Sequence, residues 1–390
     1  MTNTIDPLPK TSTAIFIRQY WDLVGGLIFA VIAIFLHNEH QIYFSTIFAA
    51  ISIAFLSVTV SEVAEILAER LEEPYGSFVL TFSAVAVEII LLFTILLQVS
   101  NSADALETVK GGIISAVIVD MNVLLGLAVF IGGLSFKEQE HNQDTSSSYT
   151  TILLVAASAL LVPSILKHSI DDHSRLFHAS VTIAVVLFLF YIVIYIFQTR
   201  THQHFFKATA RSRIFRLKRH NDGHGGVVEE EVEENYIFDR FPTTANFLVI
   251  FALIAAIGFT AEVFAKDGLV IFKEYGISAG LAGLIIAIIS VSPEIFTAIK
   301  AAKNDQMQRV VNIAMGASTV SIMLTVPVLM LLAYMNGIEL TLDFNTLQVG
   351  ALILTILLAW KTTDDGETNY FEGTSHLMFF ACYAIISAFY

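Results

Sequence analysis

Charged residues and cysteines are scarce in this sequence. Only 14% of its 390 residues are charged, whereas soluble domains contain roughly a quarter. The single cysteine, Cys382, excludes a disulfide framework and a cysteine-based metal motif. The GxxxxGKS/T, HExxH and GxSxG patterns are also absent, so neither an ATP-driven pump nor a common hydrolase is predicted, and no cofactor is expected. A net charge of −14 argues against a nucleic-acid partner.

Long apolar runs are abundant instead. Hydrophobic residues make up 55% of the chain, and the mean hydropathy is +0.71. A helix needs about 20 apolar residues to cross the hydrocarbon core of a bilayer. Runs of this kind cover residues 21–37, 43–68, 76–99, 112–135, 149–168, 178–198, 243–266, 277–303, 309–334, 345–361 and 372–390. The sequence therefore predicts an all-α, multi-pass membrane protein with about eleven transmembrane helices, and it shows no cleavable signal peptide.

The polar segments divide and orient the chain. Residues 1–20 form a short N-terminal segment, 21–198 hold six helices, 199–241 form a polar loop, and 242–390 hold five helices. If the N-terminus is cytoplasmic, 16 of the 21 lysines and arginines lie on the cytoplasmic side, as the positive-inside rule requires. The C-terminus is then outside. Setting the first helix aside leaves two sets of five helices, and an odd-numbered repeat must be inverted in the membrane.

The two halves carry matching acidic residues. The second helix of each set has an interior glutamate, Glu88 in SAVAVEIILLF and Glu294 in SVSPEIFTAI. Aligning Gly126 with Pro327 in the following helices places Asp120 opposite Ser321. Ionisable residues at membrane depth are costly and usually functional. The alternative is that each glutamate is structural and hydrogen-bonded to a neighbouring helix.

Two buried carboxylates suggest a transport mechanism. Desolvation disfavours their charged form, so they can be neutralised either by protons or by a divalent cation. Either loaded form could cross a low-dielectric gate, whereas the empty, doubly charged form could not, because unpaired buried charge costs several kcal/mol per ion. This rule couples protons moving one way to a cation moving the other way.

Pro293, directly before Glu294, suggests a third ligand. Proline has no N–H, so the Ile289 carbonyl loses its helical donor and becomes a candidate ligand for calcium or an alkali cation. Ser290 and Thr297 lie about one turn on either side of Glu294, and Ser292 is a further candidate for the ion pathway. A simple packing kink is the alternative for Pro293.

Other polar residues are candidates for the ion pathway or for regulation. Glu62, Glu65 and Glu69 form a stripe that is either an ion funnel or a solvated helix end. Glu262 could serve the outer side. Asp120 and Asn122 lie on different faces of one helix, so one of them is expected to line the pathway. The acidic run of the loop could sense cytosolic calcium or could be a plain charged linker; it contains Glu229, Glu230, Glu231, Glu233 and Glu234.

These segments resemble the calcium/proton exchangers of the calcium/cation antiporter superfamily, in particular its bacterial sodium- and calcium-proton branch. The likeness is carried by VAEILAERLEEPYGSFVLTFSAVAVEIIL, by SPEIFTAIKAAKNDQMQRVVNIAMGASTVSIMLTVPVL and by WKTTDDGETNYFEGTSHLMFF. It implies one helix plus two inverted five-helix repeats in a bacterial plasma membrane. It also implies that Glu88 and Glu294 are the two essential acids, that Asp120 lies near a polar site position, and that Ser318 is its counterpart.

The resemblance has one departure. Many family members have glycine-asparagine shortly before each glutamate, whereas this chain has Ala84-Val85 and Ser290-Val291. Two amide ligands are therefore missing. We expect Ca²⁺/H⁺ exchange across the lipid bilayer, with Na⁺ or K⁺ kept open as the exchanged cation. A cation channel is also open; an intramembrane enzyme is disfavoured because Ser290, Ser292 and Asp120 are too sparse for a catalytic set. The oligomeric state, a homo-oligomer included, is left open.

Overall fold

The computed structural model describes residues 20–71, 75–100, 102, 104–167, 172–208 and 237–389. The first half contains α2 (Trp21–Asn38), α3 (Ile42–Arg70), α4 (Tyr75–Leu96), α5 (Ala105–Val119), η1 (Asp120–Leu124), α6 (Leu125–Phe136), β1 (Glu138–Glu140), α7 (Gln143–Leu166), α8 (His173–Ile196), η2 (Phe197–Thr201) and η3 (Gln203–Phe206). The second half contains η4 (Ile237–Arg240), α10 (Thr243–Glu274), α11 (Ala279–Lys303), α12 (Met307–Val320), η5 (Ser321–Thr325), α13 (Val326–Met335), α14 (Thr346–Thr363), β2 (Glu367–Asn369) and α15 (Tyr370–Phe389).

The predicted fold class is confirmed. Each of the eleven apolar runs coincides with a helical stretch, and α5–η1–α6 and α12–η5–α13 are each one continuous span. Within the described ranges, nine helices are long and apolar enough to cross a membrane, and Thr81–Leu96 is a shorter apolar helix. Large apolar side chains cover the surface; Leu248 is 70% exposed and Phe259 is 66% exposed. Such a surface suits lipid chains rather than water.

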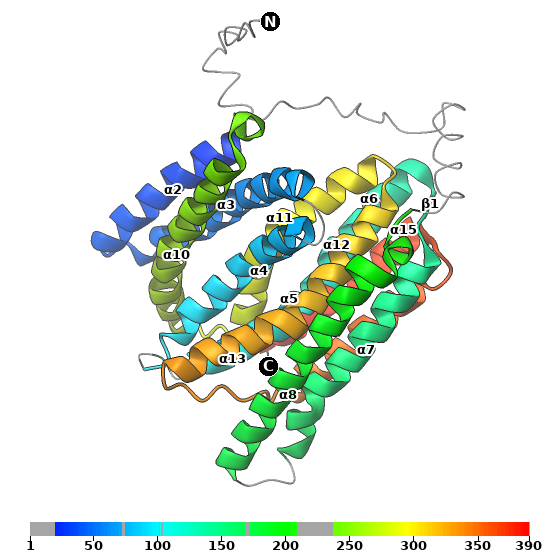
Figure 1. Ribbon diagram of the computed structural model, residues 1–390. Helices are drawn as coiled ribbons and strands as arrows, with labels where there is room; N and C mark the ends of the chain where they lie inside the picture. Colours follow the sequence, from blue (N-terminus) through cyan, green and yellow to red (C-terminus); the bar gives the residue numbers. More distant parts are fainter. Residues whose placement is uncertain are drawn as a thin grey trace, which may run out of the picture.

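Helices of the two repeats are interleaved. In Figure 1, α2, α3 and α10 form one group, while α7 and α8 lie on the opposite side of α5 and α12. Across the repeats, α3 packs against α10, α5 against α11, and α6 against α15. The α5–α11 crossing is very close, because a Cβ on Gly283 would lie 2.4 Å from the backbone nitrogen of Gly112. Glycine at this position therefore lets the two halves meet backbone to backbone.

One π-helical segment interrupts the third helix of each repeat. The segment η1 begins at Asp120, and η5 begins at Ser321. These are the residues that the alignment of Gly126 with Pro327 placed opposite one another. The local break therefore recurs at the same repeat position although the sequences differ. Single-turn π segments inside α-helices are frequent at functional sites.

A two-stranded ribbon was not predicted from the sequence. β1 pairs antiparallel with β2, with Gln139 opposite Thr368. Strands of three residues leave no periodic signal in a sequence, which explains the omission. Gln139 is fully buried and donates to the Ala302 carbonyl and to the Asp305 carboxylate, both at 3.0 Å. The ribbon therefore ties the end of α6 to the end of α11. Residues 1–19 and the acidic run 229–234 lie outside the described residues.

Candidate cation-binding site

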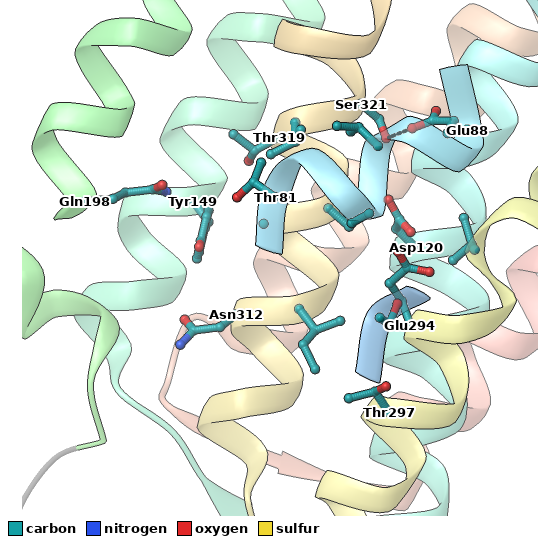
Figure 2. Close-up of a pocket in the computed structure, with 18 of the residues that line it drawn as sticks. Thr81, Glu88, Asp120, Tyr149, Gln198, Glu294, Thr297, Asn312, Thr319 and Ser321 are labelled. Carbon is teal, nitrogen blue, oxygen red and sulfur yellow. Dashed lines mark hydrogen bonds between the residues drawn. The ribbon is translucent and has the colours of Figure 1, made fainter. Parts of the chain in front are cut away.

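A cavity of about 500 Å³ lies between helices of both repeats. Its walls come from α3, α4, α7, α8, α11 and α12 together with the π segments η1 and η5. Figure 2 shows three carboxylates, Glu88, Asp120 and Glu294, on one side of the cavity, with Tyr149 and Asn312 on the other. The sequence had singled out all three acids, and the fold brings them to a single cavity.

Glu88 reaches from α4 to the π segment of the other repeat. Its side chain is buried, and its Oε2 accepts hydrogen bonds from Ser321 Oγ at 2.9 Å and Thr325 Oγ1 at 3.1 Å. The Ser321 bond is drawn in Figure 2. The other oxygen, Oε1, is buried and has no hydrogen-bond partner within the described residues. Two hydroxyl donors thus stabilise the carboxylate on one side and leave one oxygen available to a cation or a proton.

Asp120 of η1 and Glu294 of α11 are the other two acids of the cavity. Asp120 Oδ2 accepts from Ser318 Oγ at 3.1 Å, whereas its buried Oδ1 has no partner in the described part of the chain. Oε2 of Glu294 is likewise buried and has no hydrogen-bond partner among the described residues. Asp120 lies within electrostatic range of both glutamates. Buried polar atoms are nearly always paired, so three unpaired carboxylate oxygens at one cavity indicate a site for exchangeable positive charge.

The three acids line a wall rather than a closed cage. Among the residues that the structure describes, no group of three His, Cys, Asp or Glu side chains is positioned to hold a metal ion together. The three carboxylates therefore lie along one side of the cavity and do not converge on one point.

The mouth of the cavity carries an ion pair between the repeats. Glu65 of α3 pairs with Arg309 of α12, and both side chains line the cavity while remaining nearly half exposed. The cavity therefore connects the buried acids with one surface of the protein. Of the acidic stripe expected at this helix end, Glu65 lines the cavity, whereas Glu62 and Glu69 are not among its lining residues.

Sequence reasoning missed the residues that narrow this mouth. Phe206 and Tyr149 both line the cavity, and their rings lie edge to face at 5.2 Å. Asn312 Nδ2 donates to the Phe206 carbonyl at 2.9 Å, and Asn142 Nδ2 donates to the Phe205 carbonyl at 2.9 Å. The start of the polar loop is thus held at the cavity entrance. Only the aromatic run HFF at 204–206 could have signalled this in the sequence.

The Ile289 carbonyl, expected as a cation ligand without a hydrogen-bond donor, has a donor in the structure. The helix α11 continues across Pro293, and Ser292 Oγ donates to the Ile289 carbonyl at 2.7 Å in place of the missing N–H. Neither Ile289 nor Ser292 lines the cavity. Ser290 and Thr297 do line it, and their hydroxyls donate to the helix backbone, which leaves their oxygen lone pairs free to face an ion.

Three further candidates lie away from the cavity. Asn122, expected as a ligand, is fully buried and directs its amide toward α14 and α15. Ser318 is not among the lining residues but bonds the Asp120 carboxylate. Glu262, expected on the outer pathway, is exposed and pairs with Lys266 on the same helix at 2.6 Å. Of the two polar residues on the third helix, Asp120 therefore lines the cavity.

Comparison with known proteins agrees with this architecture. Relatives include the sodium-potassium/proton antiporter ChaA of Escherichia coli (strain K12), 26% identical over 91% of this chain and 93% of that protein. A Ca²⁺/H⁺ antiporter of Aphanothece halophytica is 24% identical over 93% of this chain and 94% of that protein. The solved structure of native YfkE covers 95% of this chain and 100% of its own, with a TM-score of 0.75 and 19% identity.

A second solved structure, that of the H⁺/Ca²⁺ exchanger CAX, covers 95% of this chain and 93% of its own with a TM-score of 0.65 and 17% identity. Because both sequence identities are low, these two structural matches show a shared fold. The sodium/calcium exchanger protein family model matches residues 40–200 and 245–389, which together make up most of the sequence. The matched segments contain both repeats and all three cavity carboxylates. This integral membrane protein therefore belongs to the sodium/calcium exchanger protein family.

Proposed function

We propose that this protein is a secondary antiporter that exports a cation in exchange for protons, with Ca²⁺ as the favoured cation. The observation that carries the proposal is the set of three buried carboxylate oxygens without partners on Glu88, Asp120 and Glu294. Oxygen ligands of this kind suit hard cations such as calcium. The same oxygens accept protons, so one site can serve both loads.

Exchange follows from competition at Glu88 and Glu294. A cation entering from the mouth displaces protons from the carboxylates, because burial makes an uncompensated charge costly. The loaded site then becomes accessible from the other side, where protons displace the cation. The protonated site can return, whereas the empty, charged site is disfavoured. No nucleotide is needed, because the proton gradient supplies the energy.

The identity of the cation depends on the details of the site. The relatives include both a sodium-potassium/proton antiporter and Ca²⁺/H⁺ antiporters, at nearly the same identity. Ala84 and Val85 line the cavity where many family members have glycine-asparagine, so the site lacks an amide ligand there. Hydroxyls and water then supply the remaining oxygens, which also suits Na⁺ or K⁺. A Na⁺(K⁺)/H⁺ antiporter with the same carboxylates is therefore the second candidate.

The proposed orientation places the cavity mouth in the cytoplasm. The mouth lies at the end of the molecule that carries Arg70, Lys300 and Arg309, and basic residues favour the cytoplasmic side. The N-terminus is then cytoplasmic, the C-terminus is outside, and the bacterial plasma membrane is the expected location. In this orientation the cavity receives its cation from the cytosol.

Reconstitution tests the proposal. Purified protein is placed in proteoliposomes containing a pH-sensitive dye, a proton gradient is imposed, and Ca²⁺, Na⁺, K⁺ and Mg²⁺ are added in turn. The proposal expects Ca²⁺ to release protons at the lowest concentration. Release by Na⁺ or K⁺ alone would favour the second candidate. Cation flux without proton movement would indicate a channel and overturn antiport.

A further inference from the structure

A buried polar network surrounds Asn122, two residues after Asp120 in the π segment. Asn122 Nδ2 donates to the Ile118 carbonyl at 3.1 Å and to Thr355 Oγ1 of α14 at 2.9 Å. Asn122 Oδ1 lies 2.9 Å from His376 Nδ1 of α15. The other ring nitrogen, Nε2, lies 3.0 Å from Thr362 Oγ1. Asn122, Thr355 and His376 are all fully buried, so water does not share these bonds.

The direction of every bond in this network is determined. The Ile118 carbonyl can only accept, so the amide nitrogen of Asn122 must face it and the amide oxygen must face His376. His376 Nδ1 therefore carries a hydrogen and donates to Asn122. In the neutral ring, Nε2 then accepts from the Thr362 hydroxyl. One histidine thus joins α15 and α14 to the π segment in a single arrangement.

The backbone is shaped to bring His376 to this point. A Cβ on Gly126 would lie 2.9 Å from the His376 Cβ, which is closer than side chains normally pack. Glycine at 126 thus lets α15 approach α6 one turn after Asn122. The repeat position that matches Asn122 under the same alignment is Met323, which is buried and apolar. The network therefore belongs to the Asp120 half of the site alone.

We propose that His376 is a positioning residue that fixes the π segment carrying Asp120, and thereby sets the affinity of the cavity for its cation. His376 does not touch the cavity. It acts through Asn122, whose amide occupies the Ile118 carbonyl and stabilises the irregular turn on which Asp120 lies. Groups that orient a ligand from behind typically change metal affinity by about tenfold or more when removed. This inference rests on the proposed cation/proton exchange.

The test compares His376→Ala, His376→Gln and His141→Ala in proteoliposomes. We expect His376→Ala to raise the half-saturating cation concentration about tenfold while the maximal rate changes little. Glutamine has a donor and an acceptor in reach of the same partners, so His376→Gln should recover most of the affinity. His141 is also buried but bonds Ser146 and the Thr363 carbonyl, not the π segment. His141→Ala is therefore the matched control and should leave the affinity unchanged.

The outcomes separate the proposed exchange function from the positioning role of His376. Absence of cation/proton exchange in the wild type would refute the proposed function rather than this inference. With an active wild type, equal affinities in His376→Ala and His141→Ala would overturn the positioning role, as would failure of His376→Gln to recover affinity. If His376→Ala does not fold, Thr362→Val removes only the outer hydrogen bond of the ring. Thr362→Val should also raise the half-saturating cation concentration. An unchanged concentration would refute the inference as well.

Discussion

The hydroxyls that donate to Glu88 provide a graded test of the site. Ser321 and Thr325 both bond Oε2 of this carboxylate, and such bonds favour its charged form over its protonated form. Thr325→Val removes one hydroxyl while keeping the shape of the side chain. A hydrogen bond to a charged group contributes about 1.5–3 kcal/mol. Since one pH unit corresponds to about 1.4 kcal/mol, the pH of half-maximal transport should rise by about one to two units.

The sign of this shift follows from competition. Without the hydroxyl, protons hold Glu88 more strongly, so a higher pH is needed before the cation can displace them. The assay is the initial rate of exchange at a fixed cation concentration from about pH 6 to 8.5, the range over which the wild type should rise. Adding Ser321→Ala to Thr325→Val should shift the curve further in the same direction.

A matched control lies in the same cavity. Thr319 lines the cavity, is buried, and its hydroxyl has no hydrogen-bond partner among the described residues. Thr319→Val therefore makes the same chemical change without removing a donor to Glu88, and its pH curve should shift less than that of Thr325→Val. An unshifted or acid-shifted curve for Thr325→Val, or equal shifts in the two variants, would refute the role given to these hydroxyls.

Three other predictions concern Asp343, Pro293 and the acidic run of the polar loop. Burial alone would raise the pKa of Asp343, but hydrogen bonds from Lys110, Lys167 and Thr341 outweigh it and lower the pKa to about 2. The stabilising effect of the Asp343 carboxylate is therefore full above the unfolded pKa of about 3.9 and is lost as pH falls toward 2. Asp343→Asn should lower the melting temperature at pH 7. A difference in melting temperature from wild type that persists undiminished near pH 3 would contradict this. Pro293→Ala should leave the half-saturating cation concentration within about twofold of the wild-type value, since the Ile289 carbonyl already accepts a hydrogen bond from Ser292. A tenfold rise would indicate that the Ile289 carbonyl is a cation ligand. Neutralising all five glutamates of the run 229–234 should alter the calcium dependence of activation and leave ion selectivity unchanged, and complete loss of transport in a folded variant would place this loop in the mechanism.

The sequence predicted the membrane architecture because the signals involved are strong and local. Eleven apolar runs and the placement of basic residues need no knowledge of packing. The acids Glu88 and Glu294 stood out because charge is rare at membrane depth. The repeat alignment also anticipated that Asp120 and Ser321 share a position, which the two π segments confirm.

What the sequence could not show depends on contacts between distant residues. Asn122 and Asp120 are equally polar, and only the packing of α14 and α15 determines that Asn122 faces His376 while Asp120 faces the cavity. The Ile289 carbonyl was expected to lack a donor, but the hydroxyl of the serine next to the proline replaces the missing N–H. Phe206 at the cavity mouth comes from a loop whose position no periodicity reveals.

The most direct measurement is proton-coupled exchange by Glu88→Gln and Glu294→Gln in proteoliposomes. The amide keeps the size of each side chain and removes the titratable charge. Glu262→Gln is the control, because this glutamate is exposed, pairs with Lys266 and does not line the cavity. We predict that each cavity variant inserts and folds but shows no proton-coupled cation flux, while the control exchanges like the wild type. Substantial proton-coupled flux in either Glu88→Gln or Glu294→Gln would contradict the two-carboxylate mechanism.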